Sequence, residues 1–287
     1  LSVPADGQPR QRLWRVYSQY ALLCAGATER SIAFENNDRP GIMLAGSVRA
    51  YANRWATAVG DRIAIFTNND DAYRTAHDLH QLGVEIAAVI DSRPEAPESN
   101  NFEVLSASEV VNTHGRLGLN SIDVKTPQGL RQIQVSGLGV SGGWNPNIHL
   151  TCHQRGRPQW NAALSSFIPS ADLPKGLHVA GAANGQMTTV ATIDDAVKKA
   201  AKITKNCGRK PTPLTKLKTS EESTSITPFW YVTGTERGWV DQQNDVTVKD
   251  IKLAHQENFR SVEHLKRYTT LGLSLIHISE PTRRRGI

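Results

Sequence analysis

The sequence IAIFTNNDDAYRTAHDLHQLGVEIAAVIDSRP, residues 63–94, contains two strand patterns on either side of a helix pattern. Residues 62–67 are apolar and rich in β-branched side chains, and residues 84–90 form an unbroken apolar run, as in a parallel strand covered on both faces. Residues 71–82 repeat small and apolar side chains at helical spacing, and Gly83 supplies a helix stop. This order predicts a Rossmann-type layer in an α/β fold.

The turn after the first strand lacks the glycines that let Rossmann proteins approach a pyrophosphate. Asn68 and Asn69 are residue types that tolerate the left-handed conformation, so they can replace glycine there. Asp70 and Asp71 place two carboxylates at the helix start, where we expect them to cap the helix and repel phosphate. Asp91 ends the second strand, where Rossmann proteins place an acid that binds a ribose hydroxyl. We therefore predict a Rossmann layer whose own phosphate site is degenerate.

The composition favours a globular protein without nucleic-acid or membrane partners. The 287 residues are 39% hydrophobic, enough for one large or two ordinary domains with cores of their own. No run approaches the roughly 18 apolar residues of a membrane span. The formal net charge of +6 is scattered rather than gathered into a basic stripe, which disfavours nucleic-acid binding. The sequence begins with a polar stretch rather than a signal peptide, so we expect a cytoplasmic location.

The sequence contains no recognisable catalytic or metal site. Cys24, Cys152 and Cys207 are widely separated and form no C-x-x-C pair. Histidines recur at helical spacing, but no third metal ligand accompanies them. The G-x-S-x-G, H-E-x-x-H and P-loop motifs are absent. We therefore predict neither a catalytic residue nor a metal ligand.

Both ends of the sequence look cut. Residues 12–27, RLWRVYSQYALLCAGA, read as a strand whose partners should precede it, so we interpret the chain as an internal fragment. Residues 273–283, LSLIHISEPTR, match a translated transposase-type sequencing adaptor. We interpret residues 273–287 as an adaptor-derived tail and leave them out of the fold prediction.

Two further segments bracket the strand–helix–strand unit. Residues 22–30, LLCAGATER, end a strand in a small-residue turn. Residues 176–202, GLHVAGAANGQMTTVATIDDAVKKAAK, read as a strand, a glycine-containing turn and a long helix. Together with SGGWNPNIHL, residues 141–150, this order resembles the two-dinucleotide-binding flavoprotein family, which includes the pyridine nucleotide-disulfide reductases.

The resemblance implies a partial first dinucleotide-binding domain, residues 1–30 and 151–205, interrupted by a second Rossmann-type domain, residues 31–150. Two departures from the family concern its ligand. Ala25 stands where the family usually has threonine, and Ala182 stands where an acid bonds the flavin ribityl chain. A buried ribityl chain would lose its matched acceptor, which weakens the case for FAD and leaves a smaller dinucleotide open.

Residues 206–228 are rich in Pro, Ser, Thr and Lys without periodicity and predict an exposed linker. Residues 229–272 form a small domain with two short amphipathic helix patterns. Thr247 and Asp250 suggest a capping box at the start of the first helix.

This pair of helices resembles the ferredoxin-like helical module that holds a 2Fe–2S cluster in several amine and opine dehydrogenases. That relative carries C-x-C just before its first helix, whereas Asp241 and Gln243 stand at the corresponding positions here. Carboxylate and amide groups do not replace thiolate ligands, so we predict no cluster and no metal.

Five stretches of the sequence carry a more specific resemblance. They are AGATERSIAFENNDRPGIMLAGSVRAY (25–51), IFTNNDDAYRTA (65–76), VSGGWNPNIHL (140–150), VAGAANG (179–185) and WVDQQNDVTVKDIKLAHQENFRSVEHLKRYTTLG (239–272). Together they resemble the alpha subunits of heterotetrameric sarcosine oxidases. The resemblance implies an internal fragment that lacks the N-terminal Gly-rich turn and the C-terminal folate domain of such a subunit. The last stretch is the most specific. A helical module that has oxygen-bearing side chains in place of the cluster cysteines, next to a two-dinucleotide-binding fold, is an uncommon combination.

The resemblance implies a complex with beta, gamma and delta subunits that oxidatively demethylates sarcosine to glycine. Formaldehyde would pass to tetrahydrofolate, and oxygen would become peroxide. FAD, FMN and tetrahydrofolate would belong to the full complex, whereas this part would bind NAD as a non-reacting ligand and be inactive alone. We expect NAD to contact Gly26, Gly181, Ala182, Met187 and Thr189, with backbone N–H groups facing the ligand.

Two other functions stay open. The first is a flavin-dependent NAD(P)H reductase, or a subunit of an amine, opine or proline dehydrogenase. The second is a non-catalytic structural scaffold with an empty site. The sequence does not separate a silent NAD from an empty site, and a related secondary amine as substrate would leave these residues much the same.

Overall fold

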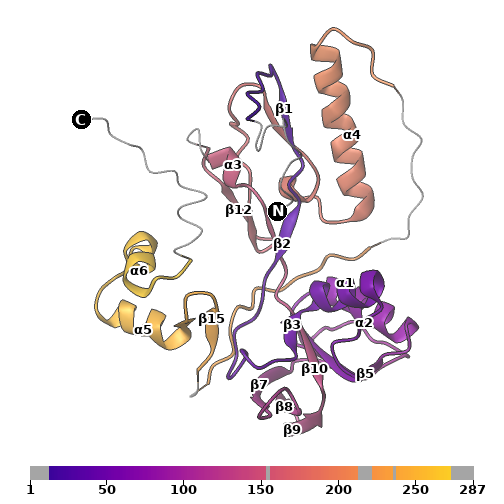
Figure 1. Ribbon diagram of the computed structural model, residues 1–287, viewed down its shortest axis with the longest axis vertical. Helices are drawn as coiled ribbons and strands as arrows, with labels where there is room; N and C mark the ends of the chain where they lie inside the picture. The colour runs from indigo at the N-terminus through magenta and orange to yellow at the C-terminus, as the bar shows by residue number, and fades with distance from the viewer. Residues whose placement is uncertain (1–12, 153–155, 213–221, 235–236, 273–287) are drawn as a thin grey trace, which may run out of the picture.

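The computed structural model describes residues 13–152, 156–212, 222–234 and 237–272 (Figure 1). The tail predicted at residues 273–287 lies outside these ranges. The described residues form a first domain, an inserted domain and a small helical module. Within them, no helix combines the length and the apolar character that crossing a bilayer requires.

A five-stranded parallel sheet forms the centre of the inserted domain. Its strands in spatial order are β3 (Ile42–Leu44), β10 (Gly137–Ser141), β4 (Arg62–Thr67), β5 (Glu85–Asp91) and β6 (Val104–Leu105). Helices α1 (Ala45–Trp55) and α2 (Asp71–Gln81) pack on one face. An antiparallel sheet packs on the other face and consists of β7 (Glu109–His114), β8 (Ser121–Thr126) and β9 (Gly129–Gln134). The predicted Rossmann-type layer is confirmed.

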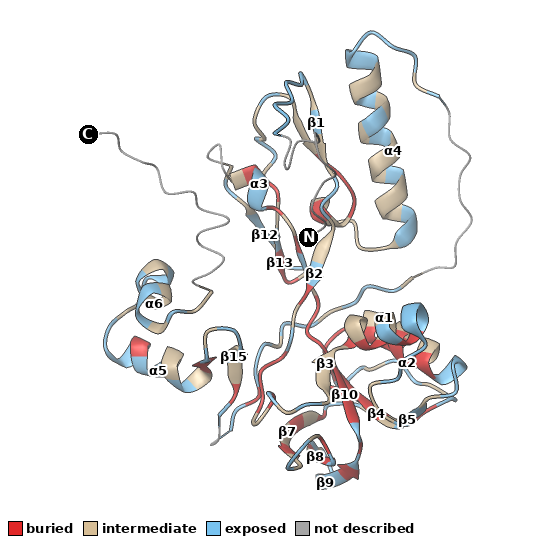
Figure 2. Ribbon diagram, viewed as in Figure 1, coloured by how far each residue is buried: buried red, intermediate tan, exposed pale blue. Residues whose placement is uncertain are grey.

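The alternation of side chains along β4 explains this layering. Ile63 and Ile65 pack with the helices, whereas Ala64 and Phe66 pack with the antiparallel sheet, and all four are fully buried. A strand that is covered on both faces needs apolar residues at every position, which is why the run is unbroken. Figure 2 shows buried residues concentrated in the central strands of the inserted domain.

Helix α2 buries the face that its sequence pattern predicted. The buried residues on this face include Ala72, Thr75, Ala76 and Leu79. The helix ends at Gln81, and Gly83 adopts a φ of +85°, in the left-handed region that glycine enters at low cost. Local sequence therefore defines both the buried face and the end of this helix.

In the first domain, β1 (Ala21–Leu23) pairs in parallel with β14 (Leu177–Val179). The turn η1 (Gly181–Asn184) and the long helix α4 (Thr189–Asn206) follow β14. The strand expected within residues 12–27 is shorter than its pattern suggested, and its partner β14 follows it in the chain rather than preceding it. The described residues that precede β1 are mostly exposed.

Two short strands join the first domain to the inserted domain. β2 (Ala27–Glu29) leads into the inserted domain and pairs antiparallel with β11 (Trp144–Pro146), which leads out of it (Figure 1). The chain then returns to the first domain through α3 (His149–Cys152), β12 (Gln159–Asn161) and β13 (Ser166–Ile168). The segment at residues 141–150 therefore leads the chain out of the inserted domain.

The helical module contains β15 (Trp239–Asp241), β16 (Val246–Thr247), α5 (Val248–Gln256) and α6 (Val262–Thr269). The predicted capping box is confirmed: Thr247 Oγ1 accepts from the Asp250 N–H, and the Asp250 carboxylate accepts from the Thr247 N–H.

Asp241 organises the turn that precedes α5. Its carboxylate accepts backbone N–H groups from Gln243 at 3.0 Å, Asn244 at 3.2 Å and Gly272 at 2.8 Å. One side chain therefore ties the beginning of the module to its end. Asp241, at the position where a cluster cysteine was considered from the sequence, thus has a structural role here.

We expect Asp241→Ala to loosen this turn, because three N–H groups lose their acceptor. Since water reaches this surface, the loss in unfolding free energy should be about 1 kcal/mol. Amide hydrogen exchange at Asn244 and Gly272 should become faster, whereas the control Gln243→Ala should leave both rates unchanged. Equal exchange in the two variants would contradict this role for Asp241.

Candidate functional site

The turn between β4 and α2 is closed by Asn69 rather than by the two aspartates. Asn69 Oδ1 accepts from the Asp71 N–H at 3.1 Å. Asp70 holds the N-cap position, yet its side chain accepts no helix N–H, because it forms an ion pair with Arg93 instead. The prediction that the aspartates cap α2 is therefore wrong. The left-handed conformation suggested for Asn68 and Asn69 is also absent.

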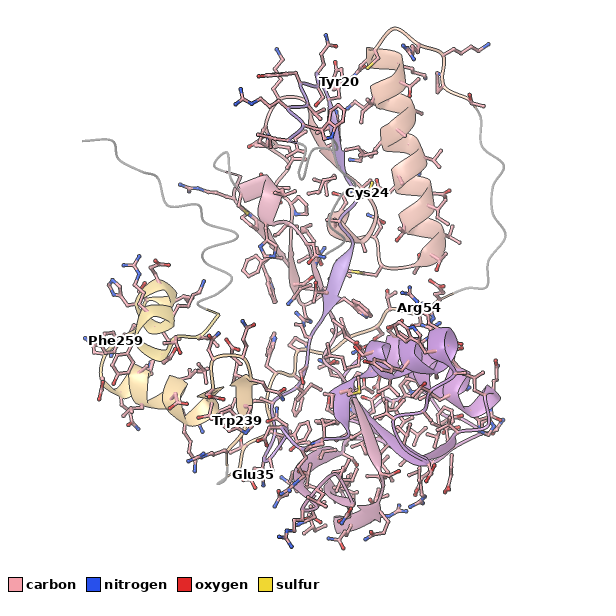
Figure 3. The ribbon with its side chains drawn as sticks, in the orientation of Figure 1. Tyr20, Cys24, Glu35, Arg54, Trp239 and Phe259 are labelled. Carbon is pink, nitrogen blue, oxygen red and sulfur yellow. The ribbon has the colours of Figure 1, made fainter. Side chains whose placement is uncertain are left out.

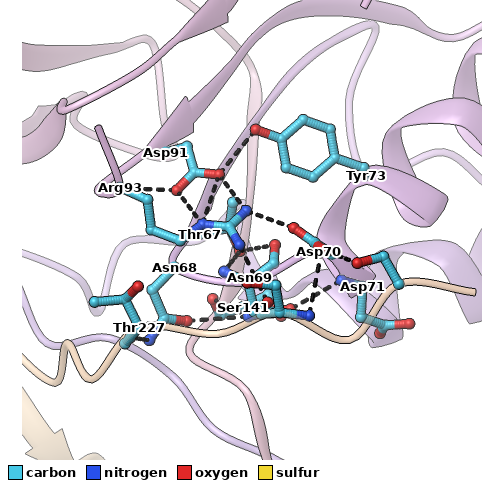
Figure 4. A network of polar contacts seen from close by, with 12 residues as sticks. Thr67, Asn68, Asn69, Asp70, Asp71, Tyr73, Asp91, Arg93, Ser141 and Thr227 are labelled. Atoms are coloured by element: carbon cyan, nitrogen blue, oxygen red, sulfur yellow. Dashed lines mark hydrogen bonds and ion pairs between the residues drawn. The ribbon is translucent and has the colours of Figure 1, made fainter. Parts of the chain in front are cut away.

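A buried ionic network lies beside this turn (Figure 4). Asp91 at the end of β5 is fully buried. Its carboxylate accepts from Arg93 Nη2 at 2.7 Å and from Tyr73 Oη at 2.8 Å. Arg93 also forms an ion pair with Asp70 at 2.7 Å. The acid that was expected to bind a ribose hydroxyl is therefore fully engaged within the protein.

Residues 222–229, which we call the strap, lie against the same turn. The Ser225 carbonyl accepts from the Asp70 N–H at 3.0 Å and from Arg93 Nη1 at 3.1 Å. The Thr227 carbonyl accepts from Asn68 Nδ2 at 2.7 Å. The composition that predicted an exposed linker did not reveal this docking, because backbone groups form most of the contacts.

The strap occupies the edge of the sheet at which α/β folds bind nucleotides. That edge is formed by the carboxyl ends of parallel strands, here the ends of β4 and β5. An isolated bridge between Asn69 and Ile226 adds the strap to this edge. The polar groups that could meet a nucleotide in the inserted domain are therefore bound by the chain itself.

A cavity of about 280 Å³ lies between the inserted domain and the first domain. Residues from both domains and from the strap line it, among them Arg49, Arg74, Trp144, Ala182, Met187 and Glu222. Its volume is near the lower end of the range for small-molecule sites, about 300 Å³. The cavity therefore suits a single ring better than a whole dinucleotide.

The structure brings only some of the predicted site residues together. Ala182 and Met187 line the cavity. Gly26 has a φ of +70° and open space around its Cα. Its neighbour Ala27 lines the cavity, whereas Gly26 itself does not.

The N–H groups of Gly181 and Thr189 already donate to acceptors within the protein. The Gly181 N–H donates to Asp195 Oδ2 at 3.0 Å. The Thr189 N–H donates to Glu222 Oε2 at 2.6 Å. Both N–H groups therefore have acceptors within the described chain, and a ligand that contacts them would have to replace Asp195 or Glu222.

A larger cavity, about 630 Å³, lies between β3 and the helical module. Trp239 lines it, and Figure 3 shows Trp239 together with Phe259 in the module. Cys24 lies in the first domain (Figure 3). Among the residues that the structure describes, no group of three His, Cys, Asp or Glu side chains could hold a metal ion.

Glu29 is the most perturbed acid beside these cavities. Its Oε2 accepts from the Gly46 N–H at the start of α1 at 2.8 Å, whereas its Oε1 is buried without a partner. Burial raises the pKa of Glu29 to about 7, and the nearby charge of Asp71 adds to this effect. Glu29 is therefore partly protonated at neutral pH.

Comparison with known proteins identifies relatives along nearly the whole chain. The family described as "Sarcosine oxidase A3 domain" matches residues 235–275. The sarcosine oxidase subunit alpha of Rhizobium meliloti (strain 1021) is 39% identical over 94% of this chain and 28% of its own length. The corresponding subunit of Corynebacterium sp. (strain U-96) is 33% identical over 93% of this chain and 30% of its own length. The predicted resemblance to the sarcosine oxidase alpha subunit is confirmed.

The chain spans less than a third of the length of these sarcosine oxidase alpha subunits. Among solved structures, L-proline dehydrogenase from P. horikoshii is 17% identical with a TM-score of 0.60, over 88% of this chain and 49% of its own. Thioredoxin reductase from T. acidophilum is 12% identical with a TM-score of 0.52, over 67% of this chain and 66% of its own. These likenesses confirm the two-dinucleotide-binding fold.

Two residues of the candidate site were not singled out by the sequence patterns. Arg93 follows Asp91 by two residues, so an acid and a base at a strand end could have indicated an internal ion pair. Glu222 lies in a stretch without periodicity and gives no such signal. Its position depends on contacts with residues far away in the sequence.

Removing the guanidinium of Arg93 should be strongly destabilising, because Asp91 would keep a buried charge without a cation to balance it. We expect Arg93→Met to lower the free energy of unfolding by about 3–5 kcal/mol in urea denaturation. The control Arg131→Met removes an exposed ion pair with Glu103 and should cost less than about 1 kcal/mol. Similar losses in the two variants would show that the Asp91 network is not the stabilising feature.

Glu29 should make stability depend on pH. Its pKa is higher in the folded protein than in the unfolded chain, so the folded state binds the proton more tightly between about pH 4.3 and 7. Its contribution to stability is therefore highest at low pH and is lost as pH rises to 7.

Glu29→Gln keeps an acceptor for Gly46 and removes this titration. Relative to the unsubstituted protein, the variant should gain up to about 3 kcal/mol between pH 5 and pH 8 in urea denaturation. A stability difference that stays constant over this range would contradict the elevated pKa.

Proposed function

We propose that this chain is the nucleotide-binding part of a sarcosine-oxidase-type alpha subunit. The complex would oxidatively demethylate sarcosine to glycine, pass formaldehyde to tetrahydrofolate and form peroxide. In this proposal the chain is not the oxidation centre. It holds NAD as a non-reacting ligand at the first dinucleotide site and provides scaffold surface for the beta, gamma and delta subunits.

The observation that carries this proposal is the occupation of the inserted domain by its own chain. Asp91 is bound to Arg93, and the strap covers the turn at Asn68 and Asp70. A dinucleotide at the inserted domain would need these same polar groups at the carboxyl ends of β4 and β5. The remaining candidate is the first dinucleotide site, where the cavity that Ala182 and Met187 line would take one ring of the nucleotide.

The residues around η1 favour NAD over FAD at this site. Ala182 offers no carboxylate to a ribityl chain. Asp195 is nearby, but its Oδ2 already accepts from the Gly181 N–H and from Asn184 Nδ2, both at 3.0 Å. A buried ribityl chain would therefore leave hydroxyl groups without acceptors, which is unfavourable. FAD is accordingly assigned to another part of the complex, as are the FMN and tetrahydrofolate that the resemblance implies.

Two other functions differ from this proposal in what they would bind. A flavin-dependent reductase, or a dehydrogenase subunit like the L-proline dehydrogenase neighbour, would carry a flavin of its own and reduce dyes with NAD(P)H. A structural scaffold would purify without any nucleotide. The nucleotide content of the purified complex therefore separates the three functions.

Replacing Ala182 by aspartate should restore an acceptor for a ribityl chain. We expect the purified Ala182→Asp complex to release an additional FAD and less NAD than the unsubstituted complex, as measured by chromatography of the released nucleotides. Ala182→Asn, which has nearly the same shape without the charge, serves as the control and should take up less FAD. Unchanged NAD and no additional flavin in Ala182→Asp would contradict the assignment of this site.

A further inference from the structure

The carboxylate of Glu222 lies at the first turn of α4. Glu222 Oε2 accepts from the Thr189 N–H at 2.6 Å, and Glu222 Oε1 accepts from Thr189 Oγ1 at 2.7 Å. The N-cap residue Thr188 meanwhile accepts from the Ala191 N–H at 3.2 Å. Glu222 of the strap therefore binds the N-terminus of α4, a position that would otherwise attract an external anion.

The surroundings keep Glu222 charged. Its side chain is only 12% exposed, and Arg74 Nη2 lies 3.5 Å from Oε1. Burial alone would raise the pKa of Glu222, but the two bonds from Thr189 and the charges of Arg74 and Arg49 outweigh burial and hold the pKa below its usual value. Arg74 is shared with Asp71, at 3.4 Å, so it does not neutralise Glu222 alone.

Glu222 lines the same ring-sized cavity as Ala182 and Met187. The two arginines of this cavity are paired with acids: Arg74 with Asp71 and Glu222, and Arg49 with Asp78. An anionic group that entered the cavity would meet the Glu222 carboxylate without a free cation to balance it. A positively charged ring would instead gain a favourable interaction.

We infer that Glu222 is a specificity-determining residue that makes this cavity prefer the positively charged, oxidised nicotinamide ring. The inference rests on the proposed function, because it concerns the nucleotide assigned to this site. The neutral ring of NADH gains nothing from the carboxylate, and a reduced flavin, which carries a negative charge, is repelled by it. The site would thereby retain NAD in the form that cannot donate a hydride.

The test compares NAD⁺ with NADH on the intact complex after bound nucleotide has been removed. Glu222→Gln keeps an acceptor for the Thr189 N–H, replaces the second carboxylate oxygen by an amide NH₂ that can donate to Thr189 Oγ1, and removes the charge. We expect its Kd for NAD⁺ to rise about tenfold, and its Kd for NADH to change less than about twofold, in titration calorimetry. Glu263→Gln, in an exposed pair with Arg267 on α6, is the control and should change neither value.

A second variant tests the Glu222 charge by removing a neighbouring cation instead of the carboxylate. Arg74→Gln removes a cation that partly balances Glu222, so it should tighten NAD⁺ relative to NADH. This change does not depend on the fold of the first variant.

The outcomes are distinct. Equal losses for NAD⁺ and NADH in Glu222→Gln, or an unchanged ratio in both variants, would overturn the inference and leave Glu222 a structural residue. Binding of neither nucleotide to the unsubstituted complex would refute the proposed function, and the inference with it. Opposite shifts of the NAD⁺ to NADH ratio in the two variants would establish it.

Discussion

The buried carboxylate of Asp91 is the constraint on which the rest of the inserted domain's edge depends. A charge without water must be paired, and Arg93 is the residue that pairs it. Arg93 in turn binds Asp70 and the carbonyl of Ser225, so the turn before α2 and the strap become parts of one connected unit. Polar groups that a Rossmann layer usually presents to a nucleotide are here used to hold the chain together.

At two other positions a carboxylate of the chain also binds polar groups of the protein itself. Asp241 gathers backbone N–H groups in the helical module, and Glu222 takes the first N–H of α4. In each case a side chain fills a place that could otherwise have held an external group. The fold is recognisably that of nucleotide-binding oxidoreductases, but several of its binding positions are satisfied from within.

Periodic patterns in the sequence predicted the parts of the fold that depend on local spacing. The strands and helix of residues 62–91 and the capping box at Thr247 follow from alternation, helical spacing and cap residues, and the structure has them. The short β1 and the docking of the strap did not follow, because pairing between distant backbone groups leaves no pattern in the side chains. The aspartates at α2 misled for a related reason: a distant arginine, not the adjacent helix, holds Asp70.

The strap also implies an order of assembly during synthesis. Ser225 and Asp70 meet across 155 residues, whereas β4, α2 and β5 are neighbours in the chain. Contacts between neighbouring elements form early, and contacts of such large separation form late. On the ribosome, the inserted domain is therefore complete in sequence well before the strap emerges. Until then its Asp70–Arg93 edge stands open to solvent, so the nascent chain passes through a stage in which a surface that the finished protein keeps covered is accessible to other molecules.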